Sequence, residues 1–412
     1  MAAERPVVFV GPEALPALAT DWSVICADSC QLTAEPERIL VLSDRERSSP
    51  SLLSSDQARH RLRSQAAAVV VWKSSVKVER LAAELGVELA NSQAALARRL
   101  ENKAHFSRAA SQAGLPIPDF QAGAAGPKLA DAAGRLGLPV VFQLAHGFSG
   151  ARTHRAATTA ELAELNARFE GQPCRISQLV EGTPVTVTGI AHPDFLEMGP
   201  ACLQLTGIPT LTPHPMGSCG NDFSSPLPHR QLVEATARRV GEWVRGQGHR
   251  GVFGVDLIVA PDGACWCIEV NSRLVASVPL FSLSARDRGS SSLLDLHLGC
   301  FGLSTAGPGR ISCHWSQLIL YRRDGPLLED RPPTGRGTID AEGNFRRAGD
   351  LPLQGPRPGE VGLVVRATAQ PGGELARVIL EGPLVDATGA LLPHLRSLAT
   401  GLRARMEVGA SG

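Results

Sequence analysis

The segment that most limits how this chain can fold runs from Gly251 to Arg273, GVFGVDLIVAPDGACWCIEVNSR. Two β-branched stretches flank an Asp-Gly pair, and Asp-Gly favours a two-residue type I′ turn between antiparallel strands. A hairpin with that turn places Asp256 directly opposite Glu269. The segment therefore predicts two facing carboxylates on one side of a strand pair.

The two faces of this hairpin differ in character because side chains alternate along a strand. Asn271 shares the face of Asp256 and Glu269, and the other face is apolar: Val255, Leu257, Val259, Trp266, Ile268 and Val270. Facing carboxylates repel each other unless a cation lies between them. Asp256, Glu269 and Asn271 are therefore candidate ligands for Mg²⁺, or for Mn²⁺ in its place. Arg273 would then neutralise a transferring phosphoryl group. The alternative is a hairpin with an ordinary polar solvent face.

Composition narrows the class of protein. The 412 residues include 40 acidic and 41 basic side chains, so no global field draws the chain to nucleic acid or to a membrane surface. Nine cysteines without a zinc-ribbon spacing indicate reduced thiols, and the longest apolar run, Ala66 to Trp72, is too short to span a bilayer. We expect a cytoplasmic protein. Only four of the basic residues are lysines, which gives weight to a lysine in a motif.

The first hundred residues alternate short strands with helical stretches, which predicts an α/β unit with a mostly parallel sheet. A single long helix, capped near Asn91 and Ser92, is expected to run through residues 95–113 and end at Gly114. The next elements are a strand at Val140–Leu144, a glycine-containing loop, and strands at Arg175–Val180 and Thr186–Ala191. Residues 207–229 are predicted to form a long ordered loop, and the chain beyond 301 to form a β-rich unit.

These elements carry a resemblance. A helix lysine (ENKAHF), a strand with a glycine loop (PVVFQLAHGFSGARTH), a strand ending in ISQLVEG, and the pair VDL and EVNSR follow one another as in the ATP-grasp superfamily. The resemblance implies an α/β and α+β multidomain fold. It has a pre-ATP-grasp domain at residues 1–99, an ATP-grasp domain at 100–301 (subdomains 100–173 and 174–301), and a β-rich C-terminal domain at 302–412.

The resemblance also implies roles for individual residues. Lys103 would contact an α- or β-phosphate, and the loop with Gly147, Ser149 and Gly150 would close over the triphosphate. The backbone of Gln178, Leu179 and Val180 would read adenine, with Glu181 near the sugar. Asp256, Glu269 and Asn271 would bind Mg²⁺, and Arg273, with Asn271, would act at the γ-phosphate or acyl phosphate.

Two positions depart from the family pattern. Gln143 stands where many members have a second lysine, so Arg152 or Arg155 would have to supply charge, and Pro184 stands where some relatives carry an acid for the ribose. In the loop at 207–229, Asn221 and Asp222 are candidates to hold an ammonium group and His214 to take a proton from an attacking amine. Arg152 is a further candidate substrate contact. A plain polar loop is the alternative for all of these.

The resemblance implies an ATP- and Mg²⁺-dependent ligase that activates a carboxylate as an acyl phosphate and joins it to an amine. Its partners would be a small-molecule acid and amine, with a homodimer left open. A carboxylase, a ligase acting on a thiol or carrier, and a nucleotide-binding regulator without turnover are the alternatives.

Overall fold

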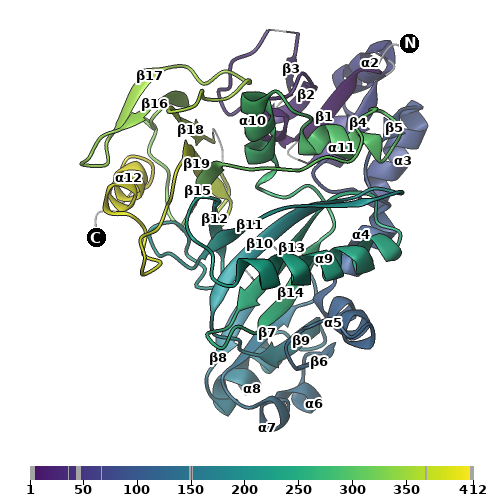
Figure 1. The fold of residues 1–412 in the computed structure, drawn as a ribbon, viewed down its shortest axis with the longest axis vertical. Coiled ribbons are helices and arrows are strands. Elements are labelled where there is room, and N and C mark those ends of the chain that lie inside the picture. The colour runs from purple at the N-terminus through teal and green to yellow at the C-terminus, as the bar shows by residue number, and fades with distance from the viewer. Residues whose placement is uncertain are drawn as a thin grey trace.

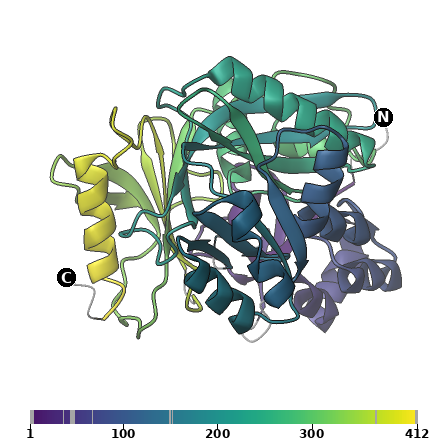
Figure 2. The ribbon, with the colours of Figure 1, turned by 90° about the horizontal axis from the view of Figure 1, so that it is seen from below.

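The computed structural model describes residues 5–35, 37–42, 48–65, 67–147, 150, 152–366 and 369–408, and it contains three β-sheets. One sheet is parallel and two are antiparallel, with helices packed around them (Figures 1 and 2). The predicted α/β and α+β multidomain fold is confirmed. In the described part of the chain no helix has the length and apolar character needed to cross a membrane.

The N-terminal sheet has five parallel strands in the order β3-β2-β1-β4-β5. Their bounds are β1 Val7–Glu13, β2 Ser23–Asp28, β3 Ile39–Val41, β4 Ala68–Val70 and β5 Glu88–Leu89; the short helices are η1 Leu15–Ala17, α1 Ser49–Ser54, α2 Asp56–Gln65 and α3 Val76–Leu85. Continuous apolar runs in β1 and β4 are buried on both sides, as parallel strands usually are.

The expected long helix is two helices, α4 (Ala94–Glu101) and α5 (Lys103–Gln112). Asn102 between them has extended backbone angles, and its side-chain oxygen accepts a hydrogen bond from the His105 N–H at 2.9 Å. Asparagine competes in this way with helical hydrogen bonding and favours helix starts. The prediction of one helix is therefore wrong, and Lys103 occupies the first turn of α5 instead of a helix interior.

The second sheet is antiparallel, in the order β6-β9-β7-β8. It consists of β6 Phe120–Ala124, β7 Val140–Leu144, β8 Thr153–Ala156 and β9 Pro173–Gln178, covered by α6 Pro127–Ala130, α7 Ala133–Leu136 and α8 Thr159–Arg168. Because β9 pairs with both β6 and β7, the hydrogen bonding of this lobe extends to Gln178, five residues beyond the expected subdomain boundary at 173.

The third sheet has ten strands in the order β14-β13-β10-β11-β12-β15-β19-β18-β16-β17. The bounds are β10 Thr183–Ala191, β11 Leu196–Thr206, β12 Ser218–Asp222, β13 Gly251–Val259, β14 Cys265–Asn271, β15 Trp315–Tyr321, β16 Gly335–Ile339, β17 Phe345–Gly349, β18 Val361–Val365 and β19 Glu374–Glu381; the helices are α9 Arg230–Gly246, α10 Val278–Arg288, α11 Leu293–Gly299 and α12 Pro393–Ala404. The β-rich C-terminal region therefore continues the sheet of the preceding region, through β12 and β15.

The prediction of one continuous loop over 207–229 is wrong, because β12 lies within it and pairs with β11 and β15. The segment before it, residues 207–217, does form a loop. Arg403 of α12 holds this loop against the C-terminal region: its guanidinium donates to the carbonyls of Thr210 at 3.0 Å and Leu211 at 3.2 Å.

The hairpin β13–β14 has the predicted pairing of Asp256 with Glu269, but its turn differs from the prediction and it contains a β-bulge. Ala260 pairs with Ala264 around a three-residue turn in which Gly263 has a φ of +89°. The prediction of a two-residue turn is therefore wrong. A β-bulge between Asp256 and Leu257 compensates for the shift, and Asp256 still pairs with Glu269. The bulge also moves Cys265 and Cys267 onto the core face in place of Trp266 and Ile268.

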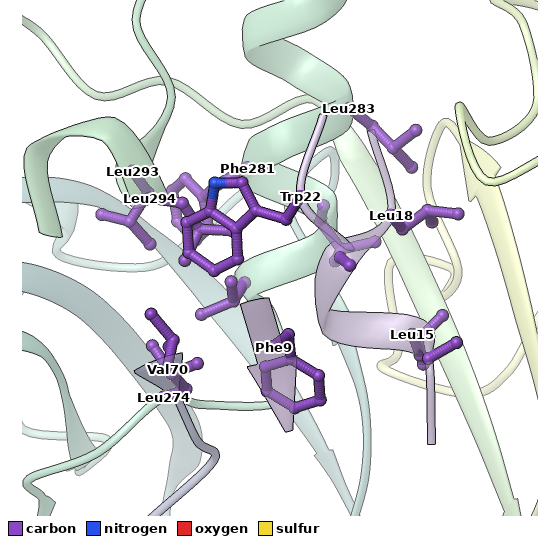
Figure 3. Packing of buried hydrophobic residues seen from close by; sticks show 14 of the residues in the cluster. Phe9, Leu15, Leu18, Trp22, Val70, Leu274, Phe281, Leu283, Leu293 and Leu294 are labelled. Atoms are coloured by element: carbon purple, nitrogen blue, oxygen red, sulfur yellow. The ribbon is translucent and has the colours of Figure 1, made fainter. Parts of the chain in front are cut away.

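A shared core joins the N-terminal unit to the rest of the molecule. Phe9, Leu15 and Trp22 of that unit lie within one buried cluster with Phe281 and Leu283 of α10 (Figure 3). Leu351 and Leu353 belong to the same cluster, and Thr33 pairs with Pro352 in an isolated bridge. Apolar burial thus fixes the N-terminal sheet relative to the ten-stranded sheet.

Candidate active site

A cavity of about 420 Å³ lies between the four-stranded sheet and the end of the ten-stranded sheet formed by β10, β11, β13 and β14. Most residues that the motifs single out line it: Lys103, Gln143, Gly147, Gly150, Arg152, Gln178, Leu179, Val180, Glu181, Asp256 and Glu269. Residues from two lobes and from four separate sequence motifs thus converge on one space. Ser149 lies outside the described residues.

The acidic end of the cavity is built by the hairpin. Asp256 is paired directly with Glu269, and Asn271 donates from its Nδ2 to Asp256 Oδ2 at 2.9 Å. Gln204 on β11 donates to the other oxygen, Asp256 Oδ1, at 3.1 Å. The expected convergence of Asp256, Glu269 and Asn271 is confirmed by this geometry.

Lys103 brings a positive charge to the same carboxylates. Its Nζ lies 2.7 Å from Glu269 Oε2, and its side chain is only 9% exposed. The backbone N–H of Lys103 donates to the Ala145 carbonyl at 3.0 Å, which ties the start of α5 to the end of β7. The break at Asn102 therefore aims the ammonium group at the acidic end of the cavity.

The two carboxyl groups differ in their readiness to ionise. Burial, together with the charge of Glu269, raises the pKa of Asp256 to about 7. Burial acts in the same direction on Glu269, but Lys103, Arg175 and Arg273 outweigh it and hold the pKa of Glu269 below its usual value. The carboxylate oxygens of Asp256 and Glu269 suit Mg²⁺. The Asn271 amide turns its nitrogen toward Asp256 and its oxygen toward Arg273, so Asn271 would have to rotate its amide to act as a third ligand.

Arg273 lies beside the acidic group and is itself held in place. Its Nη2 donates to Asn271 Oδ1 at 3.0 Å, and its Nε lies 3.3 Å from Glu101 Oε1. Lys73 forms an ion pair with the other oxygen of Glu101. Sequence reasoning missed Glu101 and Lys73, because nothing in the spacing of these residues brings β4 and α4 toward residue 273.

The described residues of the glycine loop, Gly147, Gly150 and Arg152, line the cavity. Gly150 has a φ of +72°, and a Cβ at this position would stand 2.5 Å from the Met216 carbonyl oxygen and from the Gly217 Cα. The tip of the loop therefore touches the loop at residues 207–217, and only glycine allows this approach.

Much of the remaining lining of the cavity is apolar. Val141, Leu144, Pro184, Leu257, Ile258 and Ile268 supply its walls, and the connection Gln178–Gly182 between β9 and β10 forms its rim. An apolar slot bordered by backbone N–H and C=O groups can hold a flat heteroaromatic ring and read its edge. Such a lining would suit adenine, and Glu181 is among the residues that line the cavity.

Arg175 is the main residue of the site that the motifs do not reveal. It pairs with Gln143 across β9 and β7, is 2% exposed, and its guanidinium donates to Gln143 Oε1. A charged residue between Cys174 and Ile176 in the strand PCRISQ was the available signal. Arg155, proposed as a source of charge, is exposed and does not line the cavity.

Three predicted substrate contacts lie elsewhere. Asp222 is fully buried, and its carboxylate accepts from the backbone N–H groups of Ser225 and Leu384 at 2.9 and 2.6 Å, so it shapes a turn and cannot bind an amine. Asn221 is buried against Gln317. His214 is not among the lining residues and lies beside Gly372. The cavity instead presents Gln204, Thr206 and Ser218 from the neighbouring strands.

Comparison with known proteins agrees with this architecture. Residues 100–277 match the model of the ATP-grasp domain family. A segment of 124 residues, 29% of this chain, is 30% identical to the L-propargylglycine–L-glutamate ligase of Streptantibioticus cattleyicolor, and the match spans 23% of the length of that ligase.

Solved structures extend the likeness to nearly the whole chain. N5-carboxyaminoimidazole synthase of Aspergillus clavatus, in complex with ADP and 5-aminoimidazole ribonucleotide, has a TM-score of 0.64 at 14% identity, over 98% of this chain and 100% of its own. Biotin carboxylase of Campylobacter jejuni has a TM-score of 0.63 at 13% identity, over 96% and 94%. At these identities the likeness establishes the fold. The chain therefore carries an ATP-grasp domain, at residues 100–277.

Proposed function

We propose that this protein is an ATP- and Mg²⁺-dependent ligase that joins a small carboxylic acid to an amine, forming an amide with release of ADP and phosphate. One observation carries the proposal: Lys103, Asp256 and Glu269 line one cavity together with many apolar side chains, and Asn271 donates a hydrogen bond to Asp256. The similar ligase of Streptantibioticus cattleyicolor is named for joining L-propargylglycine to L-glutamate, which supports an amino acid as one substrate.

The proposed nucleotide site follows from the lining of the cavity. Adenine would lie in the apolar slot, against the backbone of Gln178 and Val180, with Glu181 toward the sugar. Lys103 would contact the α- or β-phosphate, and the backbone N–H groups of the glycine loop would donate to the terminal phosphates. Asp256, Glu269 and Asn271 would hold Mg²⁺, which supplies charge neutralisation at the phosphates when bound.

The chemistry requires two transfers that balance. A carboxylate oxygen of the acid attacks the γ-phosphorus, the bond from that phosphorus to the bridging oxygen of ADP breaks, and an acyl phosphate forms. The amine nitrogen then attacks the acyl carbon, phosphate leaves, and the nitrogen loses a proton. Arg273, fixed by Glu101 and Asn271, would stabilise the negative charge of the transferring phosphoryl group.

The test is phosphate release from pairwise mixtures of amino acids and small acids. Release should require ATP, an acid and an amine together, and Glu269→Gln should abolish it. Glu164→Gln, on the exposed face of α8, is the matched control and should behave as the parent protein. If Glu269→Gln releases phosphate at the parental rate, the proposed site is wrong.

Hydroxylamine identifies the activated acid, because it captures an acyl phosphate as a stable hydroxamate. A hydroxamate that depends on ATP and on one particular acid supports the ligase. Phosphate release that requires bicarbonate and yields no hydroxamate would favour a carboxylase. Nucleotide binding without release in any mixture would favour a regulatory protein.

A further inference from the structure

We infer that Arg175 is a positioning residue that enables Gln143 to take the place of a second phosphate-binding lysine; the inference rests on the nucleotide site proposed above. Gln143 lines the cavity on the same strand from which the glycine loop departs. A glutamine amide carries no charge and has two ends, an NH₂ group that donates hydrogen bonds and a carbonyl oxygen that accepts them. The side chain can therefore donate to a phosphate only if its NH₂ group points into the cavity.

Arg175 determines that orientation. A guanidinium only donates hydrogen bonds, so the Gln143 atom against it must be the carbonyl oxygen, Oε1. The amide nitrogen then points the other way, where it lies 3.3 Å from Thr153 Oγ1. Within the described part of the chain this nitrogen has no other partner. Its remaining N–H is available to the cavity, whose lining also includes the cationic side chains of Lys103 and Arg152.

Besides Gln143 on β7, two further elements, α5 and β14, fix the arginine. Its Nη1 donates to Ser107 Oγ of α5 at 3.0 Å and to the Ile268 carbonyl of β14 at 2.9 Å. Burial lowers the pKa of Arg175 to about 10, with the charge of Glu269 opposing that effect, so the group stays charged near neutral pH. A fixed positive charge behind the amide polarises its N–H bonds toward an anion.

This arrangement explains why a lysine is absent at position 143. A lysine there would bring an ammonium group against the buried Arg175 guanidinium, and two like charges repel strongly in a region of low dielectric. The two positions therefore form an exchangeable pair, either Gln143 with Arg175 or a lysine with an uncharged neighbour. The exchange predicts that the two substitutions compensate for each other.

The experiment compares affinities for a slowly hydrolysed ATP analogue and for AMP, by calorimetry with Mg²⁺, together with the melting temperature of the free protein. Arg175→Met should weaken binding of the analogue about tenfold and binding of AMP less than about twofold, because only the terminal phosphates reach Gln143. Arg175→Lys keeps the charge but loses the forked set of guanidinium donors. Its affinity for the analogue should fall between that of the parent and that of Arg175→Met. Arg168→Met, on the exposed face of α8, is the control and should match the parent.

Two variants at position 143 separate positioning from folding. Gln143→Glu keeps a partner for Arg175, so the protein should melt near the parental temperature while analogue binding is lost. Gln143→Lys alone should lower both the melting temperature and the affinity. The double variant Gln143→Lys, Arg175→Met should bind the analogue more tightly than either single variant.

Three outcomes overturn the inference. In the first, Arg175→Met lowers the melting temperature but changes analogue and AMP binding by the same factor, which is a structural role alone. In the second, the double variant binds no better than Arg175→Met. In the third, the parent protein binds no analogue, which overturns the proposed function as well; in the first two cases the parent still binds, and only the inference fails.

Discussion

Lys103 Nζ and Glu269 Oε2 lie 2.7 Å apart in the wall of the cavity. The two residues belong to different motifs and are 166 positions apart in sequence. The ammonium group reduces repulsion between Glu269 and Asp256, and the nucleotide phosphates would compete with Glu269 for it. Under the proposed function, this lysine, one of only four in the chain, would serve both the free and the nucleotide-bound protein.

Replacing Lys103 should strongly reduce turnover. Lys103→Met removes the ammonium group and leaves two partly buried carboxylates facing each other. We expect ATP-dependent phosphate release to fall by about a hundredfold or more, the scale of losing one charge-stabilising donor. Lys77→Met, on the exposed face of α3, is the matched control. Equal rates for the two variants would remove Lys103 from the site.

The break between α4 and α5 can be tested at its cap. Asn102→Ala removes the acceptor for the His105 N–H and should cost about 1 kcal/mol of folding free energy. Thr158→Ala removes the equivalent cap of α8, an acceptor 3.1 Å from the Glu161 N–H, away from the cavity. Urea unfolding should report similar losses, but only Asn102→Ala should raise the KM for ATP, because Lys103 follows the cap. A parental KM would show that the helix break does not position Lys103.

How far the sequence predicts this site depends on the range of the interactions involved. Alternation along the strands correctly places Asp256 opposite Glu269, because one buried face fixes the register. The turn was mispredicted since Asp-Gly is compatible with a three-residue loop, and a bulge restored the pairing. Local rules cannot reveal such a compensation, because it depends on how Cys265 and Cys267 pack in the core.

Contacts between lobes were less predictable still. Arg175 acts on Gln143 and on the Ile268 carbonyl, which belong to different sheets, and sequence spacing carries no information on that meeting. The prediction that Asp222 contacts the substrate failed for a related reason. The polar character of Asp222 suggested a binding loop, but its carboxylate satisfies backbone N–H groups of a C-terminal segment 162 residues away.

The contact between the two loops makes Gly150 a sensitive position. Gly150→Ala forces a residue with a φ of +72° to carry a Cβ that would stand 2.5 Å from the Met216 carbonyl oxygen. The glycine loop must therefore move away from residues 216–217, and we expect the KM for ATP to rise about tenfold or more. Gly134→Ala, in α7 with open space around it, is the control and should slightly stabilise the protein. An unchanged KM for Gly150→Ala would mean that the loop contact is dispensable.

Stability should decrease in mild acid because two buried histidines stay neutral in the folded protein. His297 accepts from the Val252 N–H at 3.1 Å and donates to the Ala90 carbonyl at 2.8 Å, while His249 lies 3.0 Å from the Val252 carbonyl. Burial lowers the pKa of each to about 4. A free histidine has a pKa of about 6.5, so the unfolded chain binds protons first as the pH falls.

The stabilisation from neutral His249 and His297 is therefore complete above pH 6.5 and is lost as the pH decreases toward 4. Two protons give a slope of up to about 2.7 kcal/mol per pH unit within that window, before other groups add to it. Urea unfolding between pH 7 and 4.5 measures the slope. His297→Gln should reduce it by about half of this amount, whereas His60→Gln, exposed on α2, should leave it unchanged. A parental slope in His297→Gln would show that the buried imidazole takes up its proton without unfolding, since its contacts to Val252 and Ala90 would then survive protonation.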